Sequence, residues 1–300
     1  MNRSGPITTV TVIIPTCDRP ESLAACLASI RRQTFQPQEV IVVNDGVSEV
    51  VADGVRIVKT AGRQGPATAR SLGVEVAKTE LVAFIDDDCQ ARADWLEQLV
   101  KVIQGNVGFG FGTTVYRADG YHGHLPERVV DNHGGQYPGG ANLIFNREVF
   151  ERLGGFNSRA MGRQHEDTEL AIRAVSRGVS YVRSPEAVVY HQADRWTVSA
   201  LLASAKNLAV WVWLKDEYPK HFATFGTPVR GRVVAPSDYL VLLAMVLIVP
   251  GVLLLLLMLA RYWWLGGRDM KIFFAKWPVW FVLRRWWVWQ AAWRQRVFMV

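Results

Sequence analysis

The hydrophobic positions of the first ninety residues follow two alternating periods. Short β-branched runs, such as VTVII at residues 10–14, predict buried strands, because each is brief and stops at a proline or a turn. Similar runs occur in EVIVVNDG, VRIVKT and LVAFIDDD. Between them, PESLAACLASIRRQ and GPATARSLGVEVAKTE have apolar residues at helical spacing. This alternation predicts an α/β fold in which crossover helices connect the strands of a parallel sheet.

Beyond residue 90 the pattern is looser but still mixed. Helices are predicted in ADWLEQLVKVIQ, REVFERLGGF and EDTELAIRAVSRG, and a strand in VGFGFGTTVY. VSYVRSPEAVVYHQ predicts two further strands, and residues 117–140 a loop region. TVSALLASAKNLAVWVWL, at 197–214, predicts either a surface helix or the end of the core.

A run without charged residues extends from Tyr239 to Ala260 and predicts a membrane-inserted segment, since about 20 apolar residues suffice to cross a bilayer. Pro250-Gly251 lies near its middle, which leaves three arrangements open: a re-entrant helix–break–helix, a kinked single span, or two spans that also use IFFAKWPVWFVL. We therefore expect an α/β domain at 1–195, a connecting amphipathic region at 196–236, a membrane-inserted segment at 237–264 and an interfacial tail at 265–300.

The formal net charge of +7 belongs to the tail. Between Arg261 and Val300 eight basic residues stand against Asp269 alone, and the same segment holds eight of the twelve tryptophans. Tryptophan mixed with arginine is typical of helices that lie on anionic lipid. Nucleic-acid binding uses a similar mixture, but beside a long apolar run lipid is favoured, and we expect no nucleic-acid partner. A simple span would also separate the basic tail from the cytosolic side, so the positive-inside tendency favours re-entry.

Three cysteines, none in a CxxC pair, indicate a reducing compartment and argue against a disulfide framework or a zinc site. The first residues lack the apolar core of a signal peptide. We therefore expect a membrane-associated protein whose α/β domain is cytoplasmic.

Polar groups follow three of the predicted strands: Pro15-Thr16-Cys17-Asp18, Asn44-Asp45-Gly46 and Asp86-Asp87-Asp88. A parallel sheet brings these ends to one edge, where ligands bind. Neither a GxGxxG nor a P-loop pattern is present. Clustered carboxylates need a compensating cation, and Mg²⁺ or Mn²⁺ with a substrate phosphate suits them. In extended backbone Asp86 and Asp88 share a face while Asp87 points away. A solvated acidic turn is the alternative.

These segments, in their order, resemble the family 2 glycosyltransferases, which have the GT-A fold. The resemblance covers about residues 8–192 and rests on VTVIIPTCDRPESLAACLASI, EVIVVNDGV, GPATARSLGVEVAKTELVAFIDDDC, GGFNSRAMGRQHEDTELAIRA and VVYH. Ser71 stands where many members carry asparagine, and the centre of the DxD motif is itself an aspartate.

The resemblance implies a donor site for a nucleotide sugar. It implies that Asp45 receives the base, that Asp88 binds a metal and that Asp86 lies toward the ribose or the metal. The remaining residues implied for the donor or the metal are Pro15, Thr16 and Asp18 beside the base, Arg70 near the diphosphate, Asp87 in the nucleotide-sugar site, and His191 at the metal or diphosphate.

The resemblance also implies inverting transfer, with Asp167 as the base, Glu166 assisting on the acceptor side and Gly139-Gly140-Ala141-Asn142 beneath the acceptor. Acidic side chains also stabilise the start of a helix by capping its free N–H groups, so a purely structural role is the alternative for Glu166 and Asp167. The membrane segment points to a lipid-linked or glycan acceptor at the cytosolic face of an inner membrane. Two other functions stay open: a sugar-phosphate nucleotidyltransferase, although its Gly-rich first loop is missing from IIPTCDRPE, and a non-catalytic scaffold that binds nucleotide sugars.

Overall fold

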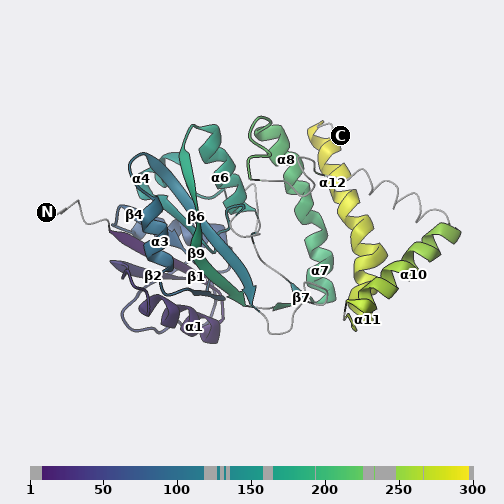
Figure 1. The fold of residues 1–300 in the computed structure, drawn as a ribbon, viewed down its shortest axis with the longest axis horizontal. Coiled ribbons are helices and arrows are strands. Elements are labelled where there is room, and N and C mark those ends of the chain that lie inside the picture. Colours follow the sequence, from purple (N-terminus) through teal and green to yellow (C-terminus); the bar gives the residue numbers. More distant parts are fainter. Residues whose placement is uncertain are drawn as a thin grey trace. The chain divides into compact units, whose positions relative to one another are not determined.

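A computed structural model of the chain describes residues 9–117, 127–128, 132, 136–157, 165–192, 194–225, 233, 248–265 and 267–296, with backbone alone at 116–117, 127–128, 194–195, 248–250 and 278. The chain divides into two compact units. The first contains residues 1–117 and 130–192, and the second residues 118–129 and 193–300 (Figure 1).

The first unit is built on an eight-stranded mixed sheet of order β3-β2-β1-β4-β8-β6-β9-β5. Its strands are β1 (Val10–Thr16), β2 (Glu39–Asn44), β3 (Arg56–Lys59), β4 (Leu81–Phe84), β5 (Cys89–Ala91), β6 (Val107–Arg117), β8 (Leu143–Asn146) and β9 (Ser180–Gln192). Its helices are α1 (Pro20–Arg31), α2 (Pro66–Val76), α3 (Trp95–Val102), α4 (Arg147–Leu153) and α6 (Glu166–Ser176). The first four strands are parallel, as the alternating pattern predicted, so the acidic ends of β1, β2 and β4 meet at one edge.

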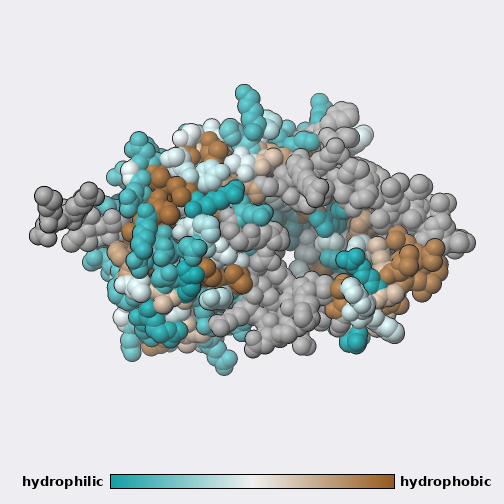
Figure 2. Space-filling model, in the orientation of Figure 1, coloured by the Kyte–Doolittle hydropathy of each residue, from teal (hydrophilic) through white to brown (hydrophobic). Residues whose placement is uncertain are grey.

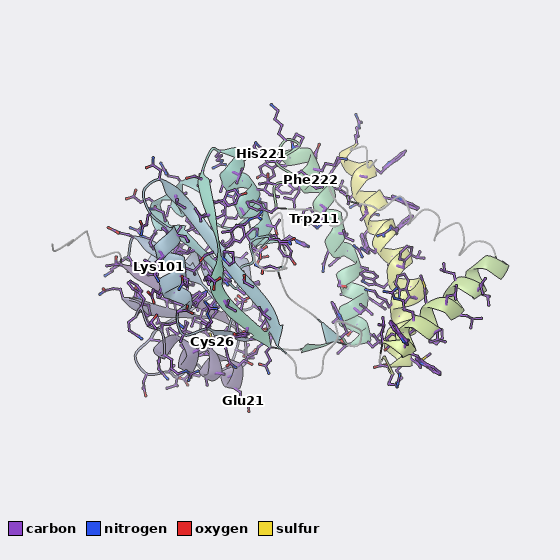
Figure 3. The ribbon with its side chains drawn as sticks, viewed as in Figure 1. Glu21, Cys26, Lys101, Trp211, His221 and Phe222 are labelled. Carbon is purple, nitrogen blue, oxygen red and sulfur yellow. The ribbon has the colours of Figure 1, made fainter. Side chains whose placement is uncertain are left out.

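Strand β1 explains why the N-terminal run is apolar at nearly every position. Alternate side chains of a strand face opposite sides of the sheet, and helices cover both sides here. Val10, Val12 and Ile14 belong to a core shared with α1 and α3, which includes Cys26 (Figure 3). Ile13 faces α2, where a Cβ on Gly73 would come within 2.5 Å of its methyl group. The glycine therefore lets α2 approach the sheet closely.

The predicted pair of strands in VSYVRSPEAVVYHQ is wrong: these residues form one long strand, β9. It runs parallel to β6, and the register shifts where Gly112 pairs with Ser184 and Thr113 with Val188. Pro185 lies in the three residues skipped there, so the shift absorbs a residue that cannot donate to the ladder. The strand thus continues to His191 at the edge that carries the acids.

Where the structure describes the second unit, it is mostly helical and includes a two-residue strand pair, β7 (Glu127–Arg128) with β10 (Asp194–Arg195). Its helical segments are α7 (Val198–Ser204), η1 (Ala205–Ala209), α8 (Val210–Glu217), α10 (Ile248–Trp264), α11 (Met270–Phe274), η2 (Ala275–Trp280) and α12 (Phe281–Gln295). Leu201, Ala205, Ile272 and Trp280 form a shared core, and Trp280 Nε1 donates to Ser204 Oγ at 3.0 Å. The ring of Trp211 meets that of Phe222 edge-on at 5.9 Å (Figure 3). The segment at 197–214 and the basic tail therefore pack together.

The uncharged run is only partly within the described residues, which exclude 239–247. The described residues from Ile248 to Trp264, Pro250 among them, form helix α10. At 17 residues α10 is about 25 Å long. Of the helices that the structure describes, none is both long enough and apolar enough to cross a membrane. The three arrangements considered for this run stay predictions.

Candidate active site

The three aspartates that follow β4 have three different surroundings. Asp87 is buried, and its Oδ2 accepts a 2.7 Å hydrogen bond from Thr16 Oγ1 on the neighbouring strand. Burial raises the pKa of Asp87 to about 6, although the Thr16 hydroxyl and the Arg19 guanidinium favour its charged form. The side chains of Asp86 and Asp88 are 28% and 22% exposed. Burial alternates along the segment, since the middle acid is buried and its neighbours are partly exposed, but residues 87 and 88 lie in a turn and not in extended backbone.

Arg70 connects two acids that lie far apart in the sequence. Its Nη2 is 2.5 Å from Asp86 Oδ1, and its Nη1 is 2.7 Å from Glu166 Oε1. Burial disfavours the charge of Arg70, but the two carboxylates outweigh this effect and raise its pKa further. Burial also raises the pKa of Glu166, as does the charge of Asp167, while Arg70 opposes the rise. The guanidinium thus fixes the start of α6 against the end of β4.

Glycine at position 140 makes this arrangement possible. A Cβ added there would lie 2.8 Å from Arg70 Cζ, whereas one at Gly139 would meet nothing within 4 Å. The loop is fixed by Asn142, which is fully buried, accepts from Trp95 Nε1 at 2.8 Å and donates to two backbone carbonyls. The stretch predicted to lie beneath the acceptor therefore has a structural task as well.

Asp167 is held by backbone on both sides. Gly140 N donates to its Oδ2 at 2.7 Å, and Thr168 N donates to its Oδ1 at 2.6 Å. His165, which precedes the acid pair, has a left-handed φ of 66°. Burial lowers the pKa of His165, against the pull of the Asp167 charge. The carboxylate of Asp167 is only partly buried and has a defined orientation.

Asp88 and His191 meet at the edge of the sheet, because β5 pairs with β9 and sets Cys89 opposite His191. His191 Nε2 is 3.4 Å from Asp88 Oδ1. One possible ligand atom each from Asp88, Cys89 and His191 lie within 4.8 Å of one another. Carboxylate and imidazole donors suit Mn²⁺, and the carboxylate suits Mg²⁺. Asp86, predicted as a second metal ligand, does not belong to this group and instead contacts Arg70.

Arg19 was not predicted as a site residue, yet it contacts two of the three aspartates. Its Nη1 is 3.2 Å from Asp87 Oδ1 and 2.7 Å from Asp88 Oδ2, and its side chain is 52% exposed. The two acids raise the pKa of Arg19, although burial opposes this effect. The sequence does hold a signal: a basic residue directly follows the polar end of β1, which is next to β4 in the sheet.

Asp45 and Asp18 organise the loops on the other side of β1. Asp45 accepts from Thr60 Oγ1 and from the backbone of Gln64 and Gly65, at 2.6 to 2.8 Å. Asp18, whose φ is 56°, accepts from Val47 N and Ser48 N, each at 2.9 Å. The backbone N–H of Ser48 is the largest of the causes that lower the pKa of Asp18. The prediction that these acids contact the nucleotide stays a prediction.

A cavity of about 310 Å³ adjoins this side of the edge. Thr16, Asp18 and Arg19 contribute to its lining, which continues along α1 and residues 48–53. The three strand ends are also linked by contacts, since Asp45 N donates to Thr16 O and Thr16 bonds Asp87. The residues predicted for the site, from Pro15 in β1 to His191 in β9, therefore lie in one unit and not on scattered surfaces.

The profile of the family described as Glycosyl transferase family 2 matches residues 11–164. The chain therefore belongs to glycosyltransferase family 2, and it is an enzyme that transfers a sugar from a nucleotide-sugar donor. This result sets aside both the nucleotidyltransferase and the non-catalytic scaffold.

Two similar proteins come from the archaeon Haloferax volcanii. The glycosyltransferase AglE is 27% identical over 207 residues, which cover 61% of this chain and 67% of AglE. A glucosyl-dolichyl phosphate glucuronosyltransferase is 27% identical over 220 residues, which cover 62% of this chain and 67% of that protein.

Two solved structures share the fold. The mannosyltransferase PcManGT from Pyrobaculum calidifontis, in complex with GDP-Man and Mn²⁺, superposes with a TM-score of 0.61 at 18% identity, over 93% of this chain and 86% of that one. GalNAc-T7 with UDP, GalNAc and Mn²⁺ gives a TM-score of 0.52 at 18% identity, over 73% of this chain and 50% of that one. The likeness confirms the predicted GT-A fold.

Proposed function

We propose that this enzyme is an inverting, metal-dependent glycosyltransferase that transfers its sugar to a lipid-linked acceptor at the cytosolic face of an inner membrane. The observation that supports the proposal is a pair of contact groups that begin at the carboxyl end of β4: Asp88 with His191, and Asp86 with Arg70, which also holds Glu166 next to Asp167. In such α/β sheets, ligands bind at the carboxyl ends of the strands.

Two positive charges would serve the donor diphosphate in this proposal: a metal ion and the guanidinium of Arg70. Asp88 and His191 would hold Mg²⁺ or Mn²⁺, and both solved relatives contain Mn²⁺ with a nucleotide or nucleotide sugar. When bound, the ion would neutralise charge on the departing diphosphate as a Lewis acid. Arg70 supplies a second, permanent positive charge beside Asp86. A buried guanidinium fixed by two carboxylates is already oriented before the donor arrives.

Asp167 takes the proton of the acceptor hydroxyl in this proposal. In a single displacement the hydroxyl oxygen forms its bond to the anomeric carbon as the nucleoside diphosphate leaves from the opposite face. The proton becomes acidic as that bond forms, so a carboxylate is a sufficient base. Gly140 N and Thr168 N orient the Asp167 carboxylate, while the bond between Glu166 and Arg70 fixes the adjoining backbone.

The acceptor assignment has two supports. One similar protein acts on a glucosyl-dolichyl phosphate, as its name states, and this chain carries an uncharged run from Tyr239 to Ala260. An apolar run of that length keeps a protein near lipid, where a polyprenyl-phosphate sugar is presented. Nucleotide sugars are made in the cytosol, which places the donor site on the cytosolic face.

The test is release of nucleoside diphosphate by the purified full-length protein. Candidate UDP- and GDP-sugars are supplied with a dolichyl-phosphate-linked sugar in detergent, with and without Mn²⁺. We expect release that requires Mn²⁺, rises with the lipid-linked acceptor and disappears in Asp88→Asn. Turnover that persists in EDTA would remove the metal from the proposal, and release stimulated by soluble glycans alone would remove the lipid-linked acceptor.

A further inference from the structure

Helix α12 has two apolar stripes on different sides. Phe281, Arg285, Val288 and Ala292, spaced by three and four residues, are buried. A second set, Val282, Trp286, Trp289 and Trp293, repeats at the same spacing but is 44%, 58%, 41% and 87% exposed. We call this second set the tryptophan stripe. Two sets at one spacing lie on two different sides of a helix.

The buried side of α12 faces the rest of the second unit. Trp280, at the start of α12, lies in the core shared with α7 and η1. The tryptophan stripe belongs to neither described core cluster. Large exposed apolar surface is uncommon in a protein that has no partner, and four side chains in register form such a surface.

The sequence around the stripe is rich in basic residues, and helix α10 of the same unit also exposes apolar side chains. After Asp269 the sequence contains six basic residues and no acid; Lys271, Arg294 and Arg296 are exposed, whereas Arg285 is buried. Helix α10 adds Val252, Leu253, Leu256 and Leu257, each more than half exposed, and ends in the exposed Trp263 and Trp264. Figure 2 shows apolar surface gathered over α10. Indole rings favour the headgroup level of a bilayer, and cations favour anionic headgroups.

We propose that the tryptophan stripe docks on a bilayer that contains anionic lipid, with α12 lying along the surface. A second copy of the chain fits less well. In a two-fold dimer the same patch meets itself, so the cations would oppose each other without an acid between them. Nucleic acid would match the charge but not the exposed leucines of α10. This inference concerns the surface of the second unit and does not depend on the transfer reaction.

Vesicle co-sedimentation of the full-length protein tests the proposal. The vesicles contain phosphatidylcholine alone or with about 30% phosphatidylglycerol. We expect the anionic vesicles to bind more protein, and salt to weaken binding between about 0.1 and about 1 M. Trp286→Ser/Trp289→Ser/Trp293→Ser should lower partitioning about tenfold or more, because the interfacial anchors are lost. Val47→Ser/Val51→Ser, which alters exposed apolar residues of the first unit, should bind like wild type.

A second readout does not rely on a variant. Brominated phosphatidylcholine placed in anionic vesicles should quench the tryptophan fluorescence of the wild-type protein, since eight of the twelve tryptophans lie beyond residue 260. Unchanged partitioning of the triple variant, or no quenching, would overturn the proposal. So would a triple variant that turns a dimer into a monomer while still binding vesicles, or a stripe that retains single-stranded RNA but no lipid.

Discussion

The two units of this chain depart from ordinary globular proteins in opposite ways. The first buries charged groups: Arg70 and Glu166 are 3% and 5% exposed. The second exposes large apolar groups, with Trp264 and Trp293 more than 80% exposed. A buried charge and an exposed aromatic surface are both costly unless something compensates them. In the first unit the compensation is internal, because Arg70 pairs with both Glu166 and Asp86. In the second we infer that it comes from lipid.

This difference separates two kinds of functional residue. Arg70 and Glu166, paired across 96 positions of sequence, belong to the site that we propose, so their removal should lower turnover. Exposed tryptophans contribute little to folding, so their removal should affect location and leave the chemistry intact. The predictions below test each side of the comparison, beginning with the largest effect.

Removing the base should have the largest effect. Asp167→Asn keeps the size of the side chain, but it can accept only one of the two backbone hydrogen bonds and cannot take the acceptor proton, so turnover should fall about 10²- to 10⁴-fold. Donor binding, measured by calorimetry, should be retained. Glu75→Gln, an exposed acid on α2, serves as the matched control and should be fully active. Near-normal turnover in Asp167→Asn would remove this residue from its role.

The two adjacent loop glycines provide a sharper test of the first unit. In Gly140→Ala the new methyl group would lie 2.8 Å from Arg70 Cζ and displace a guanidinium that holds both Asp86 and Glu166. We expect steady-state turnover about 10- to 100-fold below wild type. Gly139→Ala meets no neighbouring atom and should behave like wild type. Equal activity of the two variants would mean that the position of Arg70 does not matter.

Lys276 allows a test in the second unit. The pKa of Lys276 is lowered to about 8, first by burial and then by the charge of Arg284. The unfolded chain, with a pKa of 10.5, holds more protons between pH 8 and 10.5, so stability should rise with pH across that window. Lys276→Met should flatten this rise and stabilise the protein at pH 7 by about 2 kcal/mol, after the loss of the contact with Trp280.

The measurement for Lys276 is denaturant unfolding at pH 7 and 10, followed by tryptophan fluorescence. That signal comes mainly from the region of interest, since eight of the twelve tryptophans lie beyond residue 260. Lys271→Met, which alters an exposed lysine nearby, is the control and should change neither value. If the stability of wild type and of Lys276→Met had the same pH dependence, burial would not disfavour the charged form of this lysine.

The smallest effect is expected at Arg19. Its guanidinium contacts Asp88, the carboxylate that we assign to the metal, and a half-exposed ion pair contributes up to about 1 kcal/mol. Arg19→Gln should therefore lower the Mn²⁺ concentration that gives half-maximal activity by about two- to fivefold. Arg32→Gln, at the exposed end of α1, should leave it unchanged. A higher requirement for Mn²⁺ in Arg19→Gln would show that this arginine assists the metal and does not compete with it.

The sequence predicted the parallel half of the sheet well, because β1, β2 and β4 carry their own signals: β-branched runs that end at a proline or an acidic turn. Simple alternation correctly predicts that Asp87 differs in burial from Asp86 and Asp88, but it misses the turn at residues 87 and 88. Strand β9 was misread because Pro185 interrupts its pattern, and a register shift against β6 is a tertiary feature that no local pattern encodes.

Pairings between distant residues were the part that could not be predicted. The pairing of Arg70 with Glu166 depends on how α6 packs. The contact of Arg19 with Asp87 and Asp88 depends on the side-by-side placement of β1 and β4. The exposed stripe of α12 also needed the structure, since both of its apolar sides look alike in the sequence until one of them is buried.

The central claim is that Asp88, which follows β4, and His191, near the end of β9, form one divalent-cation site that serves the donor diphosphate. Its most direct test is the free Mn²⁺ signal in electron paramagnetic resonance as the protein is titrated, with and without the nucleoside diphosphate released from its donor. Wild type should bind one Mn²⁺, more tightly with the nucleotide present, and both Asp88→Asn and His191→Gln should weaken that binding. Identical Mn²⁺ binding by wild type and Asp88→Asn would contradict the claim.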